Sequence, residues 1–361
     1  MRALGAISGT SVDAIDIAVI ETDGQASVRP VSGASLPWPE TARAAVLAFL
    51  ADDPSRAGTE PLDALETLVT DAFAGAIAAF MAGRGIAARD IDVIGLHGQT
   101  VWHRPAARVT RQLGRGSALA RRLGVAVVDG FRLADVVAGG QGAPLAPLYH
   151  AARAASLERP LAVLNLGGVG NVTWLGEAGD ILAFDTGPGS ALMDDVARAR
   201  LGLDFDRDGA IAARGTVRTP ALAAAMTSPY LSKMPPKSLD RNEFHGALEG
   251  LEDAAPADAM ATLAALTVGT VAAARVHFPA LPRRWLVCGG GRRNTWLMAQ
   301  MRSALGVPVE PVEAVGWDGD LLEAECFAYL AVRSLQGLPL SLPGTTGAPR
   351  PMPGGLLHTP G

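Results

Sequence analysis

The sequence contains almost no lysine and almost no cysteine. Of its 31 basic residues only Lys233 and Lys237 are lysine, and only Cys288 and Cys326 are cysteine. Two thiols so far apart do not support a disulfide framework or a zinc site. The two lysines lie close together in the segment 232–238. This clustering indicates either a local need for a compact ammonium group or a solvated loop that acquired them by chance.

The chain also lacks an excess of positive charge and a long apolar run. Its net charge of −5 argues against nucleic acid or an anionic membrane as the main partner. The start Met1-Arg2 leads into a strand-like run, so we expect no secretory signal. The uncharged stretch Ala259–Ala274 is shorter than the roughly 20 residues that span a bilayer, and it predicts a buried helix. We therefore expect a cytoplasmic protein, and leave open whether it forms a homodimer.

Strands alternate with helices along the chain, which predicts an α/β fold. The predicted strands are Ala3–Ile7, Asp16–Ile20, Ile91–Leu96, Ala126–Val128, Leu161–Leu166, Val172–Leu175, Ile181–Phe184 and Trp285–Cys288. The predicted helices are Leu62–Ala82, Gly116–Leu123, Leu145–Ala155, Pro220–Met226, Asp258–Val276, Asn294–Leu305 and Leu321–Gln336. The 361 residues suffice for two domains.

A weak internal repeat supports this division. The order strand, polar glycine-containing turn, strand occurs near the N-terminus and again after residue 160, as expected after a domain duplication. We expect an N-terminal lobe of residues 1–130 plus 336–361 and a C-terminal lobe of residues 131–335. Mixed sheets flanked by helices would form both lobes around a central nucleotide and substrate cleft.

The most informative segment is Phe184-Asp185-Thr186-Gly187-Pro188-Gly189-Ser190. It places a carboxylate at the end of an apolar run and follows it with glycines. Asp185 could position or deprotonate a nucleophile, and the glycines allow main-chain N–H groups to approach phosphate. An Asp that merely caps a tight turn explains this segment alone equally well.

Further glycine turns recur at strand ends. Gly9-Thr10-Ser11 with Asp13 and Asp16 offers hydroxyls, backbone donors and carboxylates that suit phosphate and hydrated Mg²⁺, although an ordinary β-turn has the same composition. Gly289-Gly290-Gly291 before a helix start favours approach of a nucleotide. The run Gly139–Pro144 is too rich in glycine for a plain helix cap, and a flexible linker between lobes would have the same composition.

Two segments carry candidate polar ligands. His97-Gly98-Gln99-Thr100 ends a predicted strand, where the histidine would act as a base, bind sugar or serve a structural purpose. Asp320 and Glu323 share one face at a helix start. A helix cap with a capping box explains that spacing equally well.

Together these segments resemble one family, the anhydro-N-acetylmuramic acid kinases, within the superfamily of actin, sugar kinases and heat-shock ATPases. The matching stretches occur in family order and cover the chain almost end to end: Ser8–Asp13, His97–His103, Gly139–Leu145, Asn165–Gly168, Phe184–Gly189, Pro235–Ser238, Cys288–Gly291 and Asp320–Ala331. The resemblance implies two actin-like (ribonuclease H-like) lobes, an enzyme, and a requirement for ATP and Mg²⁺.

The resemblance also implies the reaction. The 1,6-anhydro bridge of anhydro-N-acetylmuramic acid would be hydrolysed at C1 while the 6-oxygen takes the γ-phosphoryl group, giving N-acetylmuramic acid 6-phosphate and ADP for recycling of cell-wall sugar. Asp185 would be the base that activates water on the face opposite the bridge. The remaining machinery would position groups and neutralise charge.

The resemblance assigns the other residues by their motifs. The implied ATP-binding residues are Gly9, Thr10, Ser11, Asp13, Asp16, Gly167, Gly168, Gly289, Gly290 and Gly291, with Asp13 as the metal candidate. The implied sugar-binding residues are His97, Gln99, Thr100 and Glu323, and Lys237 is a hypothetical partner of the acidic lactyl group.

Some positions depart from the family pattern. Ala14, Ser190, Leu239-Asp240 and Ser341 replace its usual residues, and Gly-Asp-Phe-Arg appears here as Asp129-Gly130-Phe131-Arg132. Because neighbouring residues of a strand point to opposite faces, the family role of the carboxylate does not pass directly to Asp129. Two alternatives follow: a kinase of another sugar, or a degenerate ATP-binding protein without catalysis.

Overall fold

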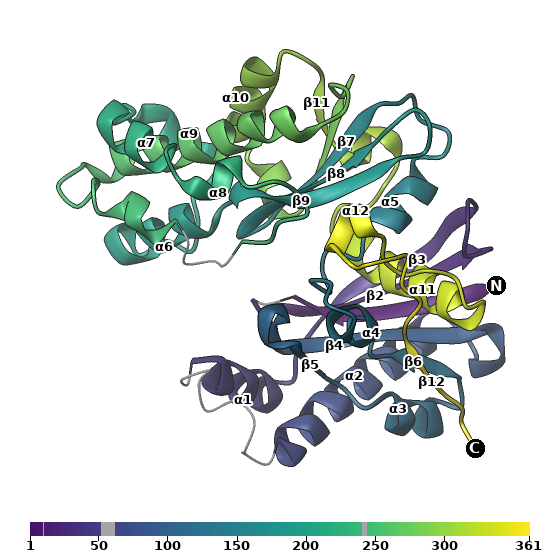
Figure 1. Ribbon diagram of the computed structural model, residues 1–361. Coiled ribbons are helices and arrows are strands. Elements are labelled where there is room, and N and C mark those ends of the chain that lie inside the picture. The colour runs from purple at the N-terminus through teal and green to yellow at the C-terminus, as the bar shows by residue number, and fades with distance from the viewer. Residues whose placement is uncertain (10, 52–61, 240–243) are drawn as a thin grey trace. The chain divides into compact units, whose positions relative to one another are not determined.

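The computed structural model describes residues 1–9, 11–51, 62–239 and 244–361, which form two compact units (Figure 1). Unit 1 comprises Met1–Ser156 and Asp320–Gly361, and unit 2 comprises Leu157–Gly319. The expected boundaries at residues 130 and 336 therefore differ from the observed ones. Residues 131–156 and 320–335 belong to unit 1. For residues 320–335 the reason is that the helix after Asp320 packs against the sheet of that unit.

The sheet of unit 1 is mixed. Its strands are β1 (Arg2–Ser8), β2 (Ala14–Thr22), β3 (Val28–Pro37), β4 (Val93–Arg104), β5 (Val109–Leu113), β6 (Val127–Asp129) and β12 (Leu356–His358). They lie in the order β12-β6-β4-β1-β2-β3, with β5 paired to β4 as a hairpin. The central strand β1 is parallel to β4 and antiparallel to β2, so the sheet combines a ββ meander with crossover connections.

Helices cover this sheet. They are α1 (Glu40–Ala51), α2 (Asp63–Gly83), α3 (Gly116–Leu123), α4 (Leu133–Val137), α5 (Pro147–Arg153), α11 (Leu322–Leu335) and α12 (Pro343–Thr346). Two strand glycines allow α11 to approach closely. A Cβ at Gly5 would lie 1.8 Å from the carbonyl oxygen of Ala324, and one at Gly95 would lie 2.1 Å from that of Phe327. This close packing fixes the start of α11, and with it Glu323, against the sheet.

Unit 2 repeats the strand order of unit 1. Its strands are β7 (Leu161–Leu166), β8 (Val169–Leu175), β9 (Ile181–Pro188), β10 (Trp285–Cys288) and β11 (Val309–Pro311), in the order β11-β10-β7-β8-β9. The first strand again lies in the centre, antiparallel to the second and parallel to the fourth. The shared topology confirms the duplication and the predicted α/β class with ribonuclease H-like strand order.

The helices of unit 2 are α6 (Ala191–Leu201), α7 (Thr219–Ala225), α8 (Pro229–Ser232), α9 (Pro256–Ala274) and α10 (Thr295–Leu305). By length and composition alone, α2 and the helical stretch 256–277 would each be long enough to cross a membrane. Half or more of each apolar stretch is buried, and Leu263 and Leu266 of α9 belong to the core of unit 2. Both helices therefore have the burial of core helices.

Two predicted strands continue further than expected. β4 runs through His97 to Arg104, because β5 pairs with its second half, and β9 runs through Asp185 to Pro188 because β8 pairs along its whole length. His97 and Asp185 therefore lie within strands rather than beyond their ends. The strands β3, β5, β11 and β12 and the helices α1, α4, α6, α8 and α12 were not predicted, and β12 lies in the tail that we expected to be irregular.

Candidate active site

Asp185 lies on β9 and is held at three of its atoms by one segment of unit 2. Its N–H donates to the carbonyl of Lys237 at 3.0 Å, its carbonyl accepts from the hydroxyl of Tyr230 at 2.7 Å, and its Oδ2 accepts from the N–H of Leu239 at 2.8 Å. Burial raises the pKa of Asp185 to about 6, although the bond from Leu239 lowers it. The carboxylate is thus fixed in place and poised to accept a proton near neutral pH.

A second feature of unit 2 is the turn at Gly167 and Gly168. Ser190 N–H donates to the carbonyl of Gly167 at 2.8 Å, and Gly189 N–H donates to that of Gly168 at 2.9 Å. A Cβ at Gly189 would lie 2.0 Å from the Gly167 oxygen, so only glycine permits this approach. The substituted Ser190 takes part through its backbone, and its side chain does not cap α6. The start of α6 and the β7–β8 turn therefore form one rigid backbone structure.

The three glycines after β10 have different surroundings. A Cβ at Gly289 would lie 2.3 Å from Oδ1 of Asn165, and one at Gly291 would lie 2.6 Å from the Leu166 side chain. At Gly290, no described heavy atom lies within 4 Å of that position. Gly289 and Gly291 therefore serve close packing against β7. Gly290 alone presents open backbone of the kind that a phosphate approaches.

In unit 1 the turn between β1 and β2 carries Gly9, Ser11 and Asp13, and Asp16 follows within β2, whereas the predicted ligand Thr10 lies outside the described residues. Asp13 has a 73% exposed side chain and pairs with Arg43 at 3.7 Å, and Asp16 accepts a hydrogen bond from Ser35 at 2.5 Å. The position of Asp13 suits a hydrated Mg²⁺, which needs only one or two carboxylates besides phosphate oxygens. No group of three metal-binding side chains occurs in the described ranges.

His97 is buried, and both of its ring nitrogens have partners. Nδ1 lies 3.1 Å from the carbonyl of Gly98, and Nε2 accepts from Nε of Arg132 at 3.0 Å. Burial, with Arg132 as a second cause, holds the pKa of His97 well below its usual value. The neutral ring therefore orients Arg132 and is not placed to act as a base or to bind sugar through Nε2.

Arg132, the last residue of the segment Asp129-Gly130-Phe131-Arg132, is a further candidate for a functional role. Its Nε bonds His97, and its Nη1 donates to the carbonyl of Gly142 at 2.7 Å. Burial lowers the pKa of Arg132, and the nearby Glu323 raises it. A planar guanidinium fixed on one edge in this way can present its remaining edge to an anionic or polar ligand.

The other predicted sugar ligands divide by exposure. Gln99 is fully buried, donates to the carbonyl of Thr100 at 3.2 Å, and leaves its Oε1 without a hydrogen bond among the described residues. Thr100 is half-buried, and Glu323 is exposed at the start of α11. The pKa of the Glu323 carboxyl is raised above its usual value. Loss of solvation is the main cause, Arg132 opposes it, and Asp16 adds to it. Glu323 does not cap the helix, because the capping position is Leu321 and no side chain bonds there.

Buried Asp135 connects the glycine loop before α5 to the C-terminal segment. Its Oδ1 accepts from Gly142 N–H at 2.6 Å, and its Oδ2 accepts from the hydroxyls of Ser341 and Thr346. Because the Gly142 carbonyl in turn holds Arg132, a continuous chain of hydrogen bonds joins the C-terminal segment to His97. Ser341, which replaces the usual asparagine, thus supplies a donor in this network.

This connection predicts a specific effect of Thr346→Val. Loss of one donor to a buried carboxylate costs about 1–3 kcal/mol. It should lower the melting temperature and, by loosening the Gly142 loop, raise the KM for sugar several-fold with the KM for ATP unchanged. The matched control is Thr345→Val: Thr345 is similarly buried but bonds only Leu342. Equal sugar KM values in the two variants would contradict the predicted connection.

Lys237 does not face solvent as the lactyl hypothesis requires. Its side chain is 4% exposed, and its Nζ donates to the carbonyls of Tyr230 and Leu231 at 3.1 Å each. The predicted contact with the acidic group of the sugar is therefore incorrect for this arrangement. A pattern of charge in the sequence identifies an ammonium group but not the direction in which it points.

The shifted carboxylate Asp129 has structural partners. Its Oδ2 accepts from the N–H of Gly116, the first residue of α3, at 2.9 Å, and its Oδ1 lies 3.0 Å from Nε2 of His358 on β12. It therefore stabilises the start of a helix and the attachment of the C-terminal strand. This placement accounts for Asp129 without a catalytic role.

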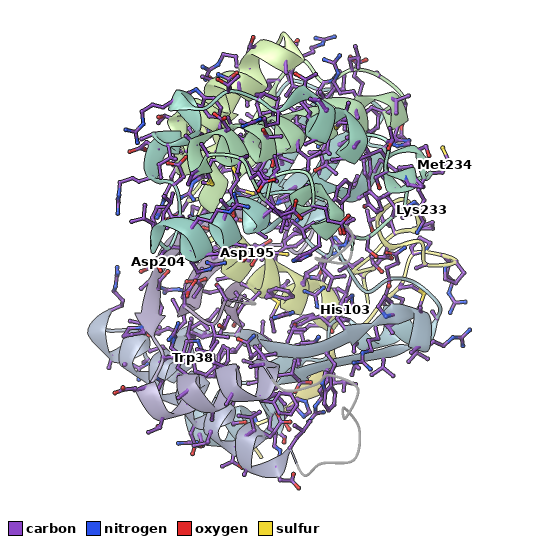
Figure 2. All side chains as sticks on the ribbon, turned by 90° about the vertical axis from the view of Figure 1, so that its left-hand side faces the viewer. Trp38, His103, Asp195, Asp204, Lys233 and Met234 are labelled. Carbon is purple, nitrogen blue, oxygen red and sulfur yellow. The ribbon has the colours of Figure 1, made fainter. Side chains whose placement is uncertain are left out.

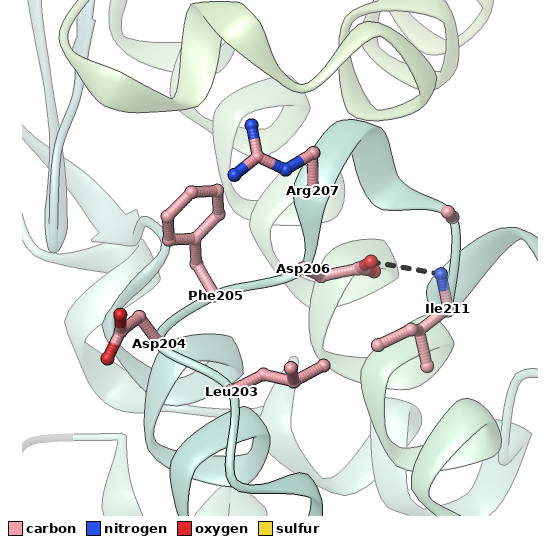
Figure 3. Close-up of a pocket in the computed structure, with 7 residues that line it drawn as sticks. Leu203, Asp204, Phe205, Asp206, Arg207 and Ile211 are labelled. Carbon is pink, nitrogen blue, oxygen red and sulfur yellow. Dashed lines mark hydrogen bonds between the residues drawn. The ribbon is translucent and has the colours of Figure 1, made fainter.

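A surface pocket in unit 2 contains none of the predicted residues. It encloses about 350 Å³ and is lined by Leu203–Arg207, Ala210 and Ile211 (Figure 3). The carboxylate of Asp206 is bonded to the N–H groups of Ile211 and Ala212 at 2.9 Å each, so it serves the local turn. We assign no ligand to this pocket.

Comparison with known proteins extends these observations. The profile of the family described as "Anhydro-N-acetylmuramic acid kinase" matches residues 1–359. A protein of that name from Paramagnetospirillum magneticum is 50% identical over 361 residues, covering 100% of both chains. Another from Rhodospirillum rubrum is 52% identical over 354 residues, covering 98% of this chain and 93% of that protein.

Solved structures of lower identity are similar in fold. Component A of (R)-2-hydroxyglutaryl-CoA dehydratase from Acidaminococcus fermentans has a TM-score of 0.49 and 13% identity, covering 93% of this chain and 99% of that chain. A ROK family glucokinase from Streptomyces griseus has a TM-score of 0.41 and 14% identity, covering 92% and 99%. Likeness of this degree identifies neither a substrate nor a site residue.

The duplicated α/β topology, with glycine turns at strand ends, is the one expected for the actin-like class. The family match spans nearly the whole chain, and the relatives are about half identical along their full length. The chain belongs to the anhydro-N-acetylmuramic acid kinase family. The expected family and the expectation that the protein is an enzyme are confirmed.

Proposed function

We propose that this protein converts anhydro-N-acetylmuramic acid, water and ATP into N-acetylmuramic acid 6-phosphate and ADP. The observation that carries the proposal is Asp185: a carboxylate with a pKa of about 6 that three backbone-directed hydrogen bonds hold in place. A family of kinases for an anhydro sugar needs such a base for the water that opens the ring. Because ATP is the co-substrate, we place this reaction in the cytoplasm.

In the proposed reaction, Asp185 accepts a proton from water as the water oxygen bonds to C1. The C1–O6 bond breaks, and its electron pair stays on O6. O6 then forms a bond to the γ-phosphorus, and the bond from that phosphorus to the bridging oxygen of ADP breaks. General-base assistance of this kind contributes about 10²–10⁴ in rate. The proton leaves Asp185 to solvent after product release.

The phosphate-binding role in this proposal belongs to exposed backbone. Gly9, Gly167, Gly168 and Gly290 have the room for close approach, and Ser11 is exposed beside Gly9, whereas Gly289 and Gly291 support the turn by packing. Asp13 would hold hydrated Mg²⁺, which neutralises charge on the transferring phosphoryl group when bound. Asp16 lies just beyond this turn, on β2, and adds a second carboxylate to this part of unit 1.

The sugar-binding role belongs to Thr100, Arg132 and Glu323. Arg132 takes the anionic contact that the sequence analysis gave to Lys237, because the lactyl group is a carboxylate and Arg132 is a fixed guanidinium. His97 and Gln99 are both buried, so in this proposal they support the binding residues and do not contact the sugar. Glu323 supplies an acceptor for sugar hydroxyls.

One assay tests this function directly. The protein is incubated with Mg-ATP and anhydro-N-acetylmuramic acid in ¹⁸O-labelled water, and the products are analysed by mass spectrometry. We expect ADP and a ring-opened 6-phosphate that carries one ¹⁸O at C1. Turnover of a free hexose in place of the anhydro sugar, or ADP without a sugar phosphate, would reject the proposal.

The pKa of Asp185 predicts the pH dependence. The base must be unprotonated, so kcat/KM should reach its plateau above about pH 7, fall to half near pH 6 and drop about tenfold per pH unit below about pH 5. Initial rates at saturating Mg-ATP between about pH 4 and about pH 8.5 measure this limb. A rate that stays at its plateau down to about pH 5 would contradict the raised pKa of Asp185.

A further inference from the structure

Lys237 has surroundings that are unusual for a lysine. Its ammonium nitrogen donates to the carbonyls of Tyr230 and Leu231 at 3.1 Å each and lies 3.2 Å from Nε2 of His277. It also lies 4.8 Å from the ring centre of Tyr230 and 5.5 Å from that of Phe184. A buried ammonium normally pairs with a carboxylate, and here carbonyl oxygens and aromatic faces replace it.

These contacts close a loop. The Lys237 side chain folds back onto the carbonyls of residues 230 and 231, so it joins the two ends of the segment 230–237. Lys233, on the same segment, is exposed and projects from the outer loop beside Met234 (Figure 2). Of the two nearby lysines, Lys237 is therefore bonded within the segment, and the exposed Lys233 provides a control for substitutions at Lys237.

The closed loop is the structure that holds Asp185. Its first residue, Tyr230, donates to the Asp185 carbonyl; its last residue, Lys237, accepts from the Asp185 N–H; and Leu239, just beyond, donates to Oδ2. The Phe184 ring beneath the ammonium belongs to the residue directly before Asp185. Lys237 thus contacts the residue before the base through its ammonium and the base itself through its carbonyl, whereas the carboxylate is bonded by Leu239, two positions further on.

We infer that Lys237 is a positioning residue: its buried ammonium closes the 230–239 segment and so fixes the Asp185 carboxylate for proton transfer. The inference rests on the proposed role of Asp185 as the base. An apolar side chain of similar length would fill the same space but remove the ammonium from both carbonyls. Among the described residues, Tyr230 would keep only the Lys233 N–H at 3.2 Å, and Leu231 only Nε2 of His277 at 3.2 Å. The segment would then open, and the Leu239 N–H would move away from Oδ2.

Charged and titratable groups around the ammonium agree with this role. Burial, with Lys233 as a second cause, lowers the pKa of Lys237 to about 8. Burial likewise lowers the pKa of His277, which faces the ammonium from the short helical turn after α9. Because these are the only lysines in the chain, ¹³C-lysine labelling gives two side-chain signals. The signal that disappears in Lys237→Met should titrate near pH 8.

The test compares Lys237→Met with Lys233→Met. In Lys237→Met we expect the amides of Asp185 and Leu239 to exchange with solvent at least 10-fold faster and kcat to fall about 30-fold at an unchanged KM for ATP. The acidic limb of kcat/KM should move above pH 6, because the lost Leu239 bond is the one that lowers the pKa of Asp185. Lys233→Met should leave all of these at wild-type values.

Two outcomes would overturn the inference. The first is wild-type amide exchange at Leu239 in Lys237→Met; the second is a fall in kcat without a shift of the acidic limb. If Lys237→Met does not fold, Lys237→Arg decides the question, since it keeps the cation and should retain slow exchange at Leu239. Amide exchange and lysine titration need no substrate, so they test the positioning role even if the proposed reaction proves wrong.

Discussion

Replacement of Asp185 by Asn should reduce kcat by about 10³-fold while the fold and ATP binding persist. The amide has nearly the same shape and keeps an oxygen that accepts from the Leu239 N–H, so the loop that holds residue 185 should keep its conformation. What is lost is the lone pair that takes the proton from water, a contribution of about 10²–10⁴ in rate. Steady-state kinetics and ATP titration on the same preparation measure both quantities.

The matched control for this variant is Asp180→Asn, on the exposed turn that precedes β9. It removes the same charge from the same part of unit 2 but leaves the base intact, so its kcat should stay within twofold of the wild-type value. A second check is the acidic limb, which should disappear in Asp185→Asn. Near-normal turnover in Asp185→Asn would mean that another group activates the water.

Short-range patterns predicted most of the scaffold. The strands β7, β8 and β9 and the repeated strand-turn-strand order depend on local hydrophobic periodicity, and the two sheets with the same strand order confirm them. The continuation of β4 beyond His97 depends instead on pairing with β5. The pairing of β4 with β1 shifts by one residue at His97, and a Cβ at Gly98 would lie 2.0 Å from the Leu113 carbonyl. A partner strand further along the chain is not visible in a local pattern.

The site residues were also predicted only as far as local patterns allow. Residue types can be read from the sequence, but the direction in which a side chain points cannot, and Lys237 and Arg132 differ in that direction. Both are cations near glycine- or proline-rich loops, yet one closes a loop in unit 2 and the other is held by a histidine and a loop carbonyl in unit 1. His97 was predicted as a ligand because it lies beside Gln99 and Thr100. Its bond to Arg132 spans 35 positions, which no local motif indicates.

The arrangement around Arg132 explains why a buried histidine and a buried carboxylate occur behind an arginine. His97 binds its Nε, and Asp135 holds the loop whose carbonyl binds its Nη1. Neither group needs to touch the sugar, and each removes one degree of freedom from the guanidinium. Preorganisation of this kind lowers the entropy cost of binding. It also means that the charge of Arg132 is less important than its planar shape.

Replacement of Arg132 by Lys should therefore be severe although the charge is kept. A single ammonium cannot bond His97 and Gly142 in the geometry of the fork, so at least one buried acceptor would lose its partner at a cost of about 1–3 kcal/mol. We expect kcat/KM for the sugar to fall about 10²-fold, mainly through KM, with the KM for ATP unchanged. Arg121→Lys on the exposed face of α3 is the matched control and should show no change. An equal loss of affinity for ATP in Arg132→Lys would place Arg132 with the nucleotide instead of the sugar.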